Sequence, residues 1–274
     1  MPVSLSPASP AVPLPTLTVA VLTKNEAHRI EHCLRSAAFA DQIVVVDSGS
    51  TDDTVARARA MGAEVWVHDD WRGFGAQRNR LLAHASSDYV FFLDADEVIT
   101  PALQEEICAN VRSARRAVWR IQWRMVVFGR ELKFFRSQSK VERLFRRDML
   151  REYVGAVHEQ AVLHPEPGGA PVPRPLMRAR LLHYSRETVR GSLEKMTQYA
   201  MLGAAKRAAQ GQRGGVLRGL LSAISMFIRL YVFHLGFLCG GAGFVHCVFV
   251  SAEGFFRYVA LDYDRASLAS DIPR

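Results

Sequence analysis

The sequence has few cysteines, and none of them stands in a spacing typical of a zinc site. Cys33, Cys108, Cys239 and Cys247 form no C-x-x-C pair and have no histidine at metal-ligand distance along the chain. Scattered single cysteines are typical of small buried side chains in a reducing compartment. The first 15 residues carry five prolines but neither a positive charge nor a continuous apolar stretch, so they do not resemble a signal peptide. We expect a cytoplasmic protein with a flexible lead over residues 1–16.

Acidic residues are outnumbered by basic ones, which gives the 274-residue chain a net charge of +8. With 49% hydrophobic and 23% charged residues, the composition is that of a globular protein. The basic excess is concentrated in residues 111–147, where twelve Lys or Arg face two acids. Such an excess indicates an anionic partner, for which nucleic acid, an anionic membrane surface and a phosphorylated substrate all qualify.

Strand and helix patterns alternate over the first part of the chain. Apolar runs predict strands, and helical spacing between them predicts helices that begin at Asn25, at a capping box over Ser50–Asp53, and near Gly75. The predicted strands are Leu17–Thr23, Ile43–Val46, Glu64–His68 and Tyr89–Leu93. This alternation over residues 17–110 predicts an α/β fold whose mostly parallel sheet has helices on both faces.

Acidic side chains follow two of these strands directly. Asp47 ends the second, and Asp94 and Asp96 follow the fourth. Open α/β sheets bind ligands beyond the carboxyl ends of their strands, so three carboxylates there suit a divalent metal and a phosphorylated ligand. The alternatives are a helix cap before Pro101 for Asp94 and Asp96, and a turn role for Asp47.

The second half of the chain has a different pattern. Residues 118–135 predict an antiparallel hairpin around Gly129, and residues 187–209 predict a helix. Leu230–Ala252 has no charged residue and is long enough to cross a bilayer, but four glycines between 236 and 243 favour a turn joining two helices. We expect a helical hairpin that lies on or dips into the membrane. A single span and an ordinary buried helix pair are the alternatives.

Seven motifs occur in an order that is known from one enzyme family. The first four are Leu22-Thr-Lys-Asn-Glu26, Val44-Val-Val-Asp47-Ser-Gly-Ser-Thr-Asp-Asp-Thr54, Gly73-Phe-Gly-Ala-Gln-Arg-Asn79 and Leu93-Asp-Ala-Asp-Glu97. Together they resemble the family-2 glycosyltransferases. Three more, Arg143-Leu-Phe-Arg-Arg147, Val157-His-Glu159 and Leu182-His-Tyr-Ser185, resemble the lipopolysaccharide-core β-1,4-glucosyltransferase branch.

The resemblance implies a fold and a division of the chain. The fold is a single Rossmann-like nucleotide-sugar domain of the GT-A type, followed by a helical, membrane-associating appendage. The catalytic domain would cover residues 17–185, with a nucleotide-sugar half over 17–110 and an acceptor half over 111–185. The helical region would cover residues 186–274.

The resemblance also implies site residues. Those expected to bind the sugar nucleotide are Thr23, Asn25, Glu26, Asp47, Gly49, Ser50, Gln77, Arg78, Asp94 and Ala95. Asp96 would bind Mn²⁺ or Mg²⁺, and Asp94 would bond the ribose or reach the metal through water. His183 would complete the metal shell, since imidazole suits manganese, or would be an ordinary core histidine. A solvated helix face is the alternative for Arg78.

Transfer with inversion needs a base that removes the proton from the acceptor hydroxyl. By family position the candidate is Glu159, with His158 as the runner-up. The sequence lacks the Glu-Asp pair that many family-2 enzymes carry at this position. The alternative for Glu159 is an ordinary surface residue at a strand end.

The sequence therefore predicts an inverting, metal-dependent glycosyltransferase, peripheral on the inner face of the cytoplasmic membrane. It would move a hexose, with UDP-glucose as donor, onto a phosphorylated or lipid-linked saccharide such as the lipopolysaccharide core, and it would not bind nucleic acid. ADP-heptose and UDP-galactose are alternative donors. Nucleotidyl transfer is a second hypothesis, although Thr23-Lys-Asn-Glu26 stands where such enzymes carry a Gly-rich loop. A membrane-associated nucleic-acid-binding module is a third.

Overall fold

A computed structural model describes residues 13–155 and 159–268 of the chain. The chain divides into two compact units. The first, here the sheet unit, comprises residues 1–121 and 141–179, and the second, here the helical unit, comprises residues 122–140 and 180–274. The expected lead over residues 1–16 falls mostly outside the described residues, and the predicted domain division stays a prediction.

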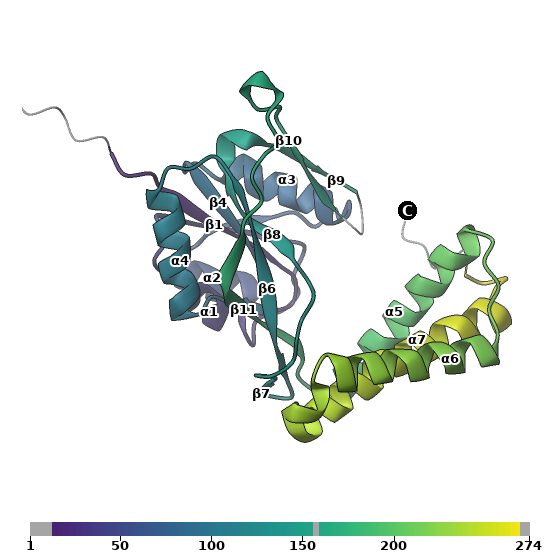
Figure 1. The fold of residues 1–274 in the computed structure, drawn as a ribbon. Coiled ribbons are helices and arrows are strands. Elements are labelled where there is room, and N and C mark those ends of the chain that lie inside the picture. The colour runs from purple at the N-terminus through teal and green to yellow at the C-terminus, as the bar shows by residue number, and fades with distance from the viewer. Residues whose placement is uncertain (1–12, 156–158, 269–274) are drawn as a thin grey trace, which may run out of the picture. The chain divides into compact units, whose positions relative to one another are not determined.

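The sheet unit begins with alternating strands and helices, as predicted (Figure 1). In chain order these are β1 (Leu17–Thr23), α1 (Ile30–Ser36), β2 (Gln42–Asp47), α2 (Thr54–Ala60), β3 (Glu64–Val67), α3 (Phe74–His84), β4 (Tyr89–Asp94), β5 (Glu97–Val98) and α4 (Pro101–Arg112). The strands that follow are β6 (Val118–Val127), β7 (Arg130–Glu131), β8 (Val141–Arg146), β9 (Leu150–Val154), β10 (Gln160–Leu163) and β11 (Leu176–Arg186).

Most of the described strands belong to one sheet with the order β3-β2-β1-β4-β8-β6-β11-β5, and β7 pairs with β6. β1 is parallel to both β2 and β4, and β2 is parallel to β3. β8 is antiparallel to β4 and to β6. The carboxyl ends of β2 and β4 therefore lie at the same edge of the sheet, and β8 begins at that edge. The predicted α/β class, with a mostly parallel arrangement of the first strands, is confirmed.

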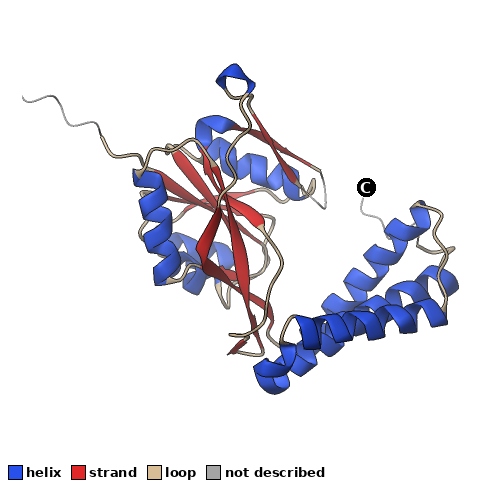
Figure 2. Cartoon of the chain, viewed as in Figure 1, coloured by secondary structure: helices blue, strands red, loops and turns tan. Residues whose placement is uncertain are grey.

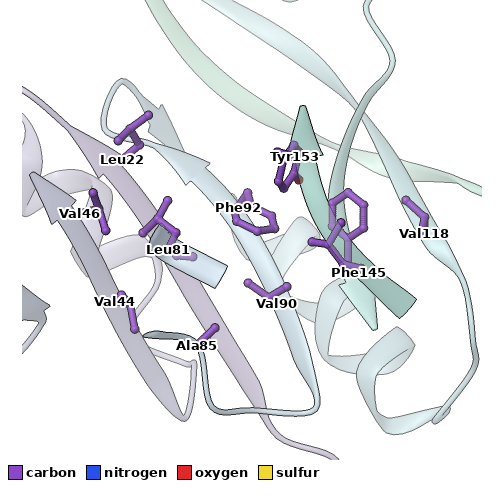
Figure 3. Packing of buried hydrophobic residues seen from close by; sticks show 12 residues of the cluster. Leu22, Val44, Val46, Leu81, Ala85, Val90, Phe92, Val118, Phe145 and Tyr153 are labelled. Carbon is purple, nitrogen blue, oxygen red and sulfur yellow. The ribbon is translucent and has the colours of Figure 1, made fainter. Parts of the chain in front are cut away.

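One face of the parallel strands packs against α3 and β9 (Figure 3). Side chains alternate between the two faces of a strand. Leu22, Val46 and Phe92 therefore share this face with the residues two positions before them, Ala20, Val44 and Val90. They meet Leu81 of α3 and Tyr153 of β9 in one buried cluster. The opposite face is equally apolar, which explains why these strands are continuous hydrophobic runs in the sequence.

Strands β9 and β10 form a separate two-stranded hairpin that α3 holds in place. The side-chain amide of Asn79 donates to the Tyr153 carbonyl at 2.9 Å, and its oxygen accepts from the Tyr153 N–H at 2.7 Å. The Gly75 N–H donates to the Gly155 carbonyl at 3.2 Å. A Cβ at Gly75 would stand 2.6 Å from that oxygen, so the close approach requires glycine.

Two helix starts differ from the prediction because local turns use the capping residues. α1 begins at Ile30, and Asn25 instead has φ 54° and accepts a hydrogen bond from the Thr51 N–H at 2.8 Å. Asp53 stands at the N-cap of α2, but its side chain forms no capping hydrogen bond. Asn readily adopts positive φ in turns, so the residue types that favour caps also favoured these turns.

The helical unit contains the hairpin end of β6 and β7 and the last part of β11, followed by helices (Figure 2). The helices are α5 (Val189–Ala209), α6 (Val216–Ile228), the π-helical segment Arg229–Phe233, the 3₁₀ segment Gly236–Cys239 and α7 (Gly240–Tyr263). The Thr188 hydroxyl caps α5 by accepting from the Gly191 N–H at 3.0 Å. The predicted hairpin around Gly129 and the predicted turn between two apolar helices are both present.

Much of the apolar surface of this unit is exposed. Val216–Phe233 and Gly236–Tyr263 are each long and apolar enough to cross a bilayer, judged by length and composition. Only 6% of the first stretch is buried, whereas the core helices of soluble proteins are mostly buried. Leu217 and Phe233 are each 69% exposed. These two helices favour membrane association over an ordinary buried pair, but only weakly.

Candidate active site

Three of the predicted acids lie at the carboxyl edge of the parallel strands. Asp47 pairs in register with Thr23, and Asp94 pairs with Leu22. Asp47 is completely buried, and its Oδ1 accepts from the N–H groups of Gly49 at 3.0 Å and Ser50 at 2.8 Å. The turn role considered for Asp47 is therefore present. Its contact with a nucleotide base stays a prediction.

The turn after β4 is not a helix cap. α4 begins at Pro101, and the Thr100 hydroxyl caps it by accepting from the Leu103 N–H at 3.2 Å. Asp94 and Asp96 therefore do not cap α4, and the cap alternative is wrong. Asp96 is partly exposed and Ala95 between them is buried, with its N–H donating to the Leu22 carbonyl at 3.2 Å.

Arg143 is a buried cation at this edge. Its guanidinium donates to Asp94 Oδ2 at 2.7 Å and to Glu97 Oε1, while Glu97 Oε2 accepts from the Asp94 N–H at 2.9 Å. The side chains of Arg143 and Glu97 are only 4% and 1% exposed. A buried guanidinium is costly unless it is paired, so the three groups depend on one another.

Neither Arg143 nor Glu97 was assigned a role from the sequence. Arg143 lies one residue before Leu144, which pairs with Phe91 of β4. Because β8 is antiparallel, its first residues reach the edge where its parallel neighbours end. The sequence signals for this pair are the Arg143-Leu-Phe motif and Glu97, the acid directly after Asp96. Neither signal distinguishes a buried ion pair from one at the surface.

Arg78 connects the predicted base to the predicted acid. Its Nε donates to Glu159 Oε1 at 2.9 Å, and its Nη2 donates to Asp94 Oδ1 at 3.2 Å. The guanidinium also lies over the rings of Phe92 and Tyr153, with its carbon 5.7 and 5.8 Å from their centroids. Arg78 is 6% exposed, so the solvated-face alternative is wrong. The structure thus brings together three predicted site residues from distant parts of the chain.

The carboxylates of this cluster keep its two guanidinium groups charged. Burial lowers the pKa of Arg78, but the Asp94 carboxylate raises it, and the net result is a pKa above the ordinary value. Burial likewise lowers the pKa of Arg143, whereas the carboxylates of Asp94 and Glu97 raise it. The net result is again a raised pKa. Both guanidinium groups therefore stay charged. Within the described residues, Nη1 of Arg78 is buried without a hydrogen-bond partner.

The remaining residues predicted to bind the sugar nucleotide lie in α3 and in the adjoining loops. Gln77 is buried and its amide donates to the Ser48 hydroxyl at 2.8 Å. The Glu26 N–H donates to the Thr54 hydroxyl at 2.8 Å, and the Glu26 carboxylate is paired with Arg29. Contacts with a donor stay predictions for all of these residues.

Thr23, at the end of β1, carries a buried hydroxyl. Its side chain is 3% exposed, and its oxygen has no hydrogen-bond partner among the described residues. A buried hydroxyl without a partner costs free energy, and a polar ligand at the edge of the sheet would remove that cost. This favours the predicted place of Thr23 in the donor pocket.

The acids fit a divalent cation that relies on its substrate for most ligands. Mg²⁺ is commonly bound by one or two carboxylates together with substrate phosphates. Within the described residues, no group of three or more His, Cys, Asp or Glu side chains is placed to hold a metal ion. Asp94 already accepts from two guanidinium groups. Such a donor set suits a metal site shared with the substrate, and the role of Asp96 as its protein ligand stays a prediction.

The other two predicted residues are less informative. His183 lies in β11, in the part that belongs to the helical unit, and its ring packs against Trp123 with centroids 4.8 Å apart. Its metal role stays a prediction. His158, the runner-up for the base, lies outside the described residues.

Cys33 lies beneath the turn that carries the acids, and its thiol is expected to react slowly. Its sulfur donates to the Asp94 carbonyl, with Sγ and O 3.6 Å apart. Burial and the nearby carboxylates of Glu97, Asp96 and Asp94 raise the pKa of the thiol well above its ordinary value. The thiolate is the nucleophile, so iodoacetamide at mildly alkaline pH should modify the partly exposed Cys108 much faster.

Peptide mapping by mass spectrometry measures both alkylation rates, and unfolding in urea should make them similar. Because the folded state raises the pKa of Cys33, its contribution to stability is present below the ordinary thiol pKa and is lost as the pH rises. Equal rates in the folded protein would contradict the burial of Cys33.

Comparison with known proteins identifies the family. The model of "Glycosyl transferase family 2" matches residues 18–160, which is more than half of the chain. The chain belongs to glycosyl transferase family 2. The predicted enzyme class is therefore confirmed, and the family match ends one residue after Glu159.

Curated relatives of this family-2 chain align over most of its length. It is 27% identical over 265 residues to the lipopolysaccharide core biosynthesis glycosyltransferase LpsC of Rhizobium meliloti (strain 1021), covering 94% of this chain and 95% of the relative. It is 28% identical over 251 residues to an uncharacterized glycosyltransferase of Rickettsia bellii (strain RML369-C), covering 88% and 84%. The predicted resemblance to a lipopolysaccharide-core glycosyltransferase is thus confirmed.

Two solved structures of one synthase resemble part of the chain. The glucosyl-3-phosphoglycerate synthase of Mycobacterium tuberculosis, in complex with phosphoglyceric acid, is 24% identical with a TM-score of 0.40. The alignment covers 50% of this chain and 58% of the synthase. A second structure of that synthase, in complex with Mn²⁺, uridine diphosphate and phosphoglyceric acid, has a TM-score of 0.38 and 24% identity, and covers 50% and 57%.

Proposed function

We propose that the chain is an inverting, metal-dependent glycosyltransferase that moves glucose from UDP-glucose onto a lipid-linked saccharide of the lipopolysaccharide core. Membership of family 2 and the resemblance to LpsC support this. The observation that carries the proposal is the contact of Arg78 with both Glu159 and Asp94. Through this contact the buried guanidinium of Arg78 links Glu159, the candidate proton acceptor, to Asp94 at the carboxyl edge of the sheet.

Glu159 acts as the general base in this proposal. Its carboxylate takes the proton from an acceptor hydroxyl while the oxygen attacks the anomeric carbon of the donor sugar. The new carbon–oxygen bond forms as the bond from that carbon to the diphosphate oxygen breaks. The nucleoside diphosphate leaves with the electron pair, and the configuration at the carbon inverts. Arg78 positions the carboxylate through Nε.

The donor side must stabilise the negative charge of the leaving diphosphate. Asp96 would hold Mn²⁺ or Mg²⁺, which when bound supplies positive charge to the diphosphate. Nη1 of Arg78, buried and without a protein partner among the described residues, donates to a diphosphate oxygen. Asp94 remains bound to the two guanidinium groups and bonds the ribose, so it orients Arg78 and Arg143 instead of binding the metal directly.

The location we propose is the inner face of the cytoplasmic membrane, where a lipid-linked acceptor is present. The exposed apolar residues of α6, such as Leu217 at 69% and Leu221 at 60%, support a peripheral attachment. Amphipathic helices bind in the plane of the interface through buried apolar area. In α7, Arg257 is paired with Glu253 at 2.5 Å.

A donor screen with a metal-site variant tests the reaction. The full-length protein is incubated with Mn²⁺, a panel of nucleotide sugars and a lipid-linked core saccharide, and the release of nucleoside diphosphate is measured. We expect turnover of UDP-glucose and a loss of roughly 100-fold or more in Asp96→Asn, since the charge stabilisation by a metal is worth several kcal/mol. Asp53→Asn, an exposed acid near α2, is the matched control and should keep its turnover.

Two outcomes contradict the proposal. One is that no sugar nucleotide is turned over or shifts the melting temperature. The other is that Asp96→Asn matches the wild-type protein in the presence of Mn²⁺. Turnover of ADP-heptose or UDP-galactose in place of UDP-glucose would change the donor and leave the reaction class in place.

A further inference from the structure

An open pocket in the helical unit is lined by polar and charged side chains at one end of α6. Its volume is about 690 Å³, and its lining residues are Gln212, Arg213, Arg218, Leu221, Ser222 and Tyr258. All of them belong to the loop before α6, to α6 itself or to α7. The motifs of the transfer reaction contain none of these residues, so the pocket has no function in the reaction proposed above.

Four arginines lie in or next to the pocket and outnumber the two aspartates nearby. Arg213 and Arg218 line it, the Arg265 guanidinium donates to the Gln212 carbonyl at 2.9 Å, and the Arg207 guanidinium lies 5.4 Å from the centroid of the Tyr258 ring. Asp262 and Asp264 lie at the C-terminal end of α7. Within the part of the chain that the structure describes, none of these four arginines forms a salt bridge.

These arginines do not serve the fold through ion pairs. Arg218 Nη1 donates to the Arg213 carbonyl at 2.8 Å, and its side chain and that of Arg213 are otherwise exposed. Guanidinium groups match the oxygens of a phosphate in geometry as well as in charge. The Ser222 hydroxyl adds a neutral donor at the same place, while the Gln212 amide donates to the Gln210 side chain at 3.0 Å. The chemistry of the pocket is that of a phosphate site.

An apolar stripe runs along α6 directly beside this pocket. Its residues recur at helical spacing on one face: Leu217, Leu220, Leu221, Ile224 and Ile228. They are 45–69% exposed. Leu221 belongs to both features, because it lines the pocket and is 60% exposed. A phosphate site that continues into an exposed apolar stripe matches a molecule with an anionic head and apolar chains.

We propose that this pocket binds the phosphate headgroup of an anionic phospholipid, with Arg213 and Arg218 as its ligands, while the apolar stripe of α6 enters the bilayer. The inference rests on the membrane location given above and specifies the lipid class that sets it. A soluble phosphate or a nucleic acid would leave the stripe in water, so the phospholipid accounts for both features. Basic residues near a membrane surface add binding energy mainly when the lipid is anionic.

Vesicle flotation of the full-length protein tests the proposal. The probes are vesicles of phosphatidylcholine alone and vesicles of phosphatidylcholine with phosphatidylglycerol. We expect the wild-type protein to prefer the phosphatidylglycerol vesicles. The double variant Arg213→Gln/Arg218→Gln should lose roughly 10- to 30-fold of its affinity for them and keep its affinity for phosphatidylcholine. Both side chains are exposed, so the helix content measured by circular dichroism should not change.

Two further variants separate charge from contact. Arg35→Gln/Arg59→Gln removes the same net charge from exposed sites of the sheet unit, and its affinity for phosphatidylglycerol vesicles should stay within about twofold of wild type. Leu217→Ser/Leu221→Ser should lose binding to both kinds of vesicle. Equal losses in the two arginine pairs would overturn the pocket, because they would indicate net charge alone.

The remaining outcomes distinguish the pocket from the membrane location. A wild-type protein that floats with neither vesicle overturns both. One that binds both vesicles equally, with no effect of Arg213→Gln/Arg218→Gln, overturns the headgroup site and keeps the location. If the double variant instead loses a melting shift caused by inorganic phosphate, or loses RNA binding, while its vesicle preference stays, the pocket serves another ligand. No donor sugar is present, so the transfer reaction is tested separately.

Discussion

Glu159→Gln is expected to lower the turnover number of the transferase by about 10²- to 10⁴-fold, the usual effect of removing a general base. Glutamine keeps an oxygen that can accept from Arg78 Nε, which Glu159 now holds at 2.9 Å. The geometry should therefore survive while the proton acceptor is lost. Donor affinity should change little, because the donor contacts proposed above do not include this carboxylate. Steady-state kinetics of nucleoside diphosphate release separates the two effects.

The matched control for this variant is Glu152→Gln. Glu152 lies in β9 of the same hairpin and pairs at the surface with its neighbour Arg151, and the side chains of Glu152 and Arg151 are 41% and 55% exposed. Its turnover should stay close to wild type. If Glu159→Gln keeps its turnover and His158→Gln loses it, the base is the histidine, and Arg78 positions a carboxylate of another function.

Arg143→Met is expected to destabilise the fold by about 3–5 kcal/mol, the typical cost of leaving a buried charge without its partner. Glu97 is 1% exposed and pairs with Arg143, and Asp94 accepts from the same guanidinium. Methionine fills much of the volume but provides no donor. Urea unfolding followed by circular dichroism measures the loss in free energy of unfolding.

Two comparisons make this result specific. Arg147→Met, at an exposed position four residues later, should change stability by less than about 0.5 kcal/mol. The double variant Arg143→Met/Glu97→Gln removes the stranded charge and should recover part of the loss. A single variant as stable as wild type would mean that the Glu97 carboxylate finds another partner or takes up a proton at no cost.

The sequence predicts the acid edge of the sheet well, for a physical reason. Strands buried on both faces are continuous apolar runs, and parallel strands end at one edge, so Asp47 and Asp94 can be placed without coordinates. The helix starts are less predictable, because Asn25 and Asp53 favour both caps and turns. The long-range hydrogen bonds of the loops decide between the two.

The cations of the site could not be predicted in the same way. Arg143 is one of twelve basic residues in a segment of 37 positions, 111–147, and nothing local separates the buried one from the exposed ones. Arg78 could equally be read as a solvated residue of α3. In both cases the decisive fact is a contact with a residue far along the chain, Asp94 or Glu159, which the pairing of strands determines.

The way in which α3 holds the β9–β10 hairpin decides which positions of the hairpin can be substituted. The hairpin is outside the main sheet, and α3 holds it through the Asn79 side chain and the Gly75 N–H, both of which contact backbone atoms only. These hydrogen bonds do not depend on the side chains of the hairpin, whereas Tyr153 packs with Leu81 in the buried cluster and is constrained by it. Exposed positions of the hairpin such as Arg151 and Glu152 are therefore expected to accept other residues without loosening its attachment to α3.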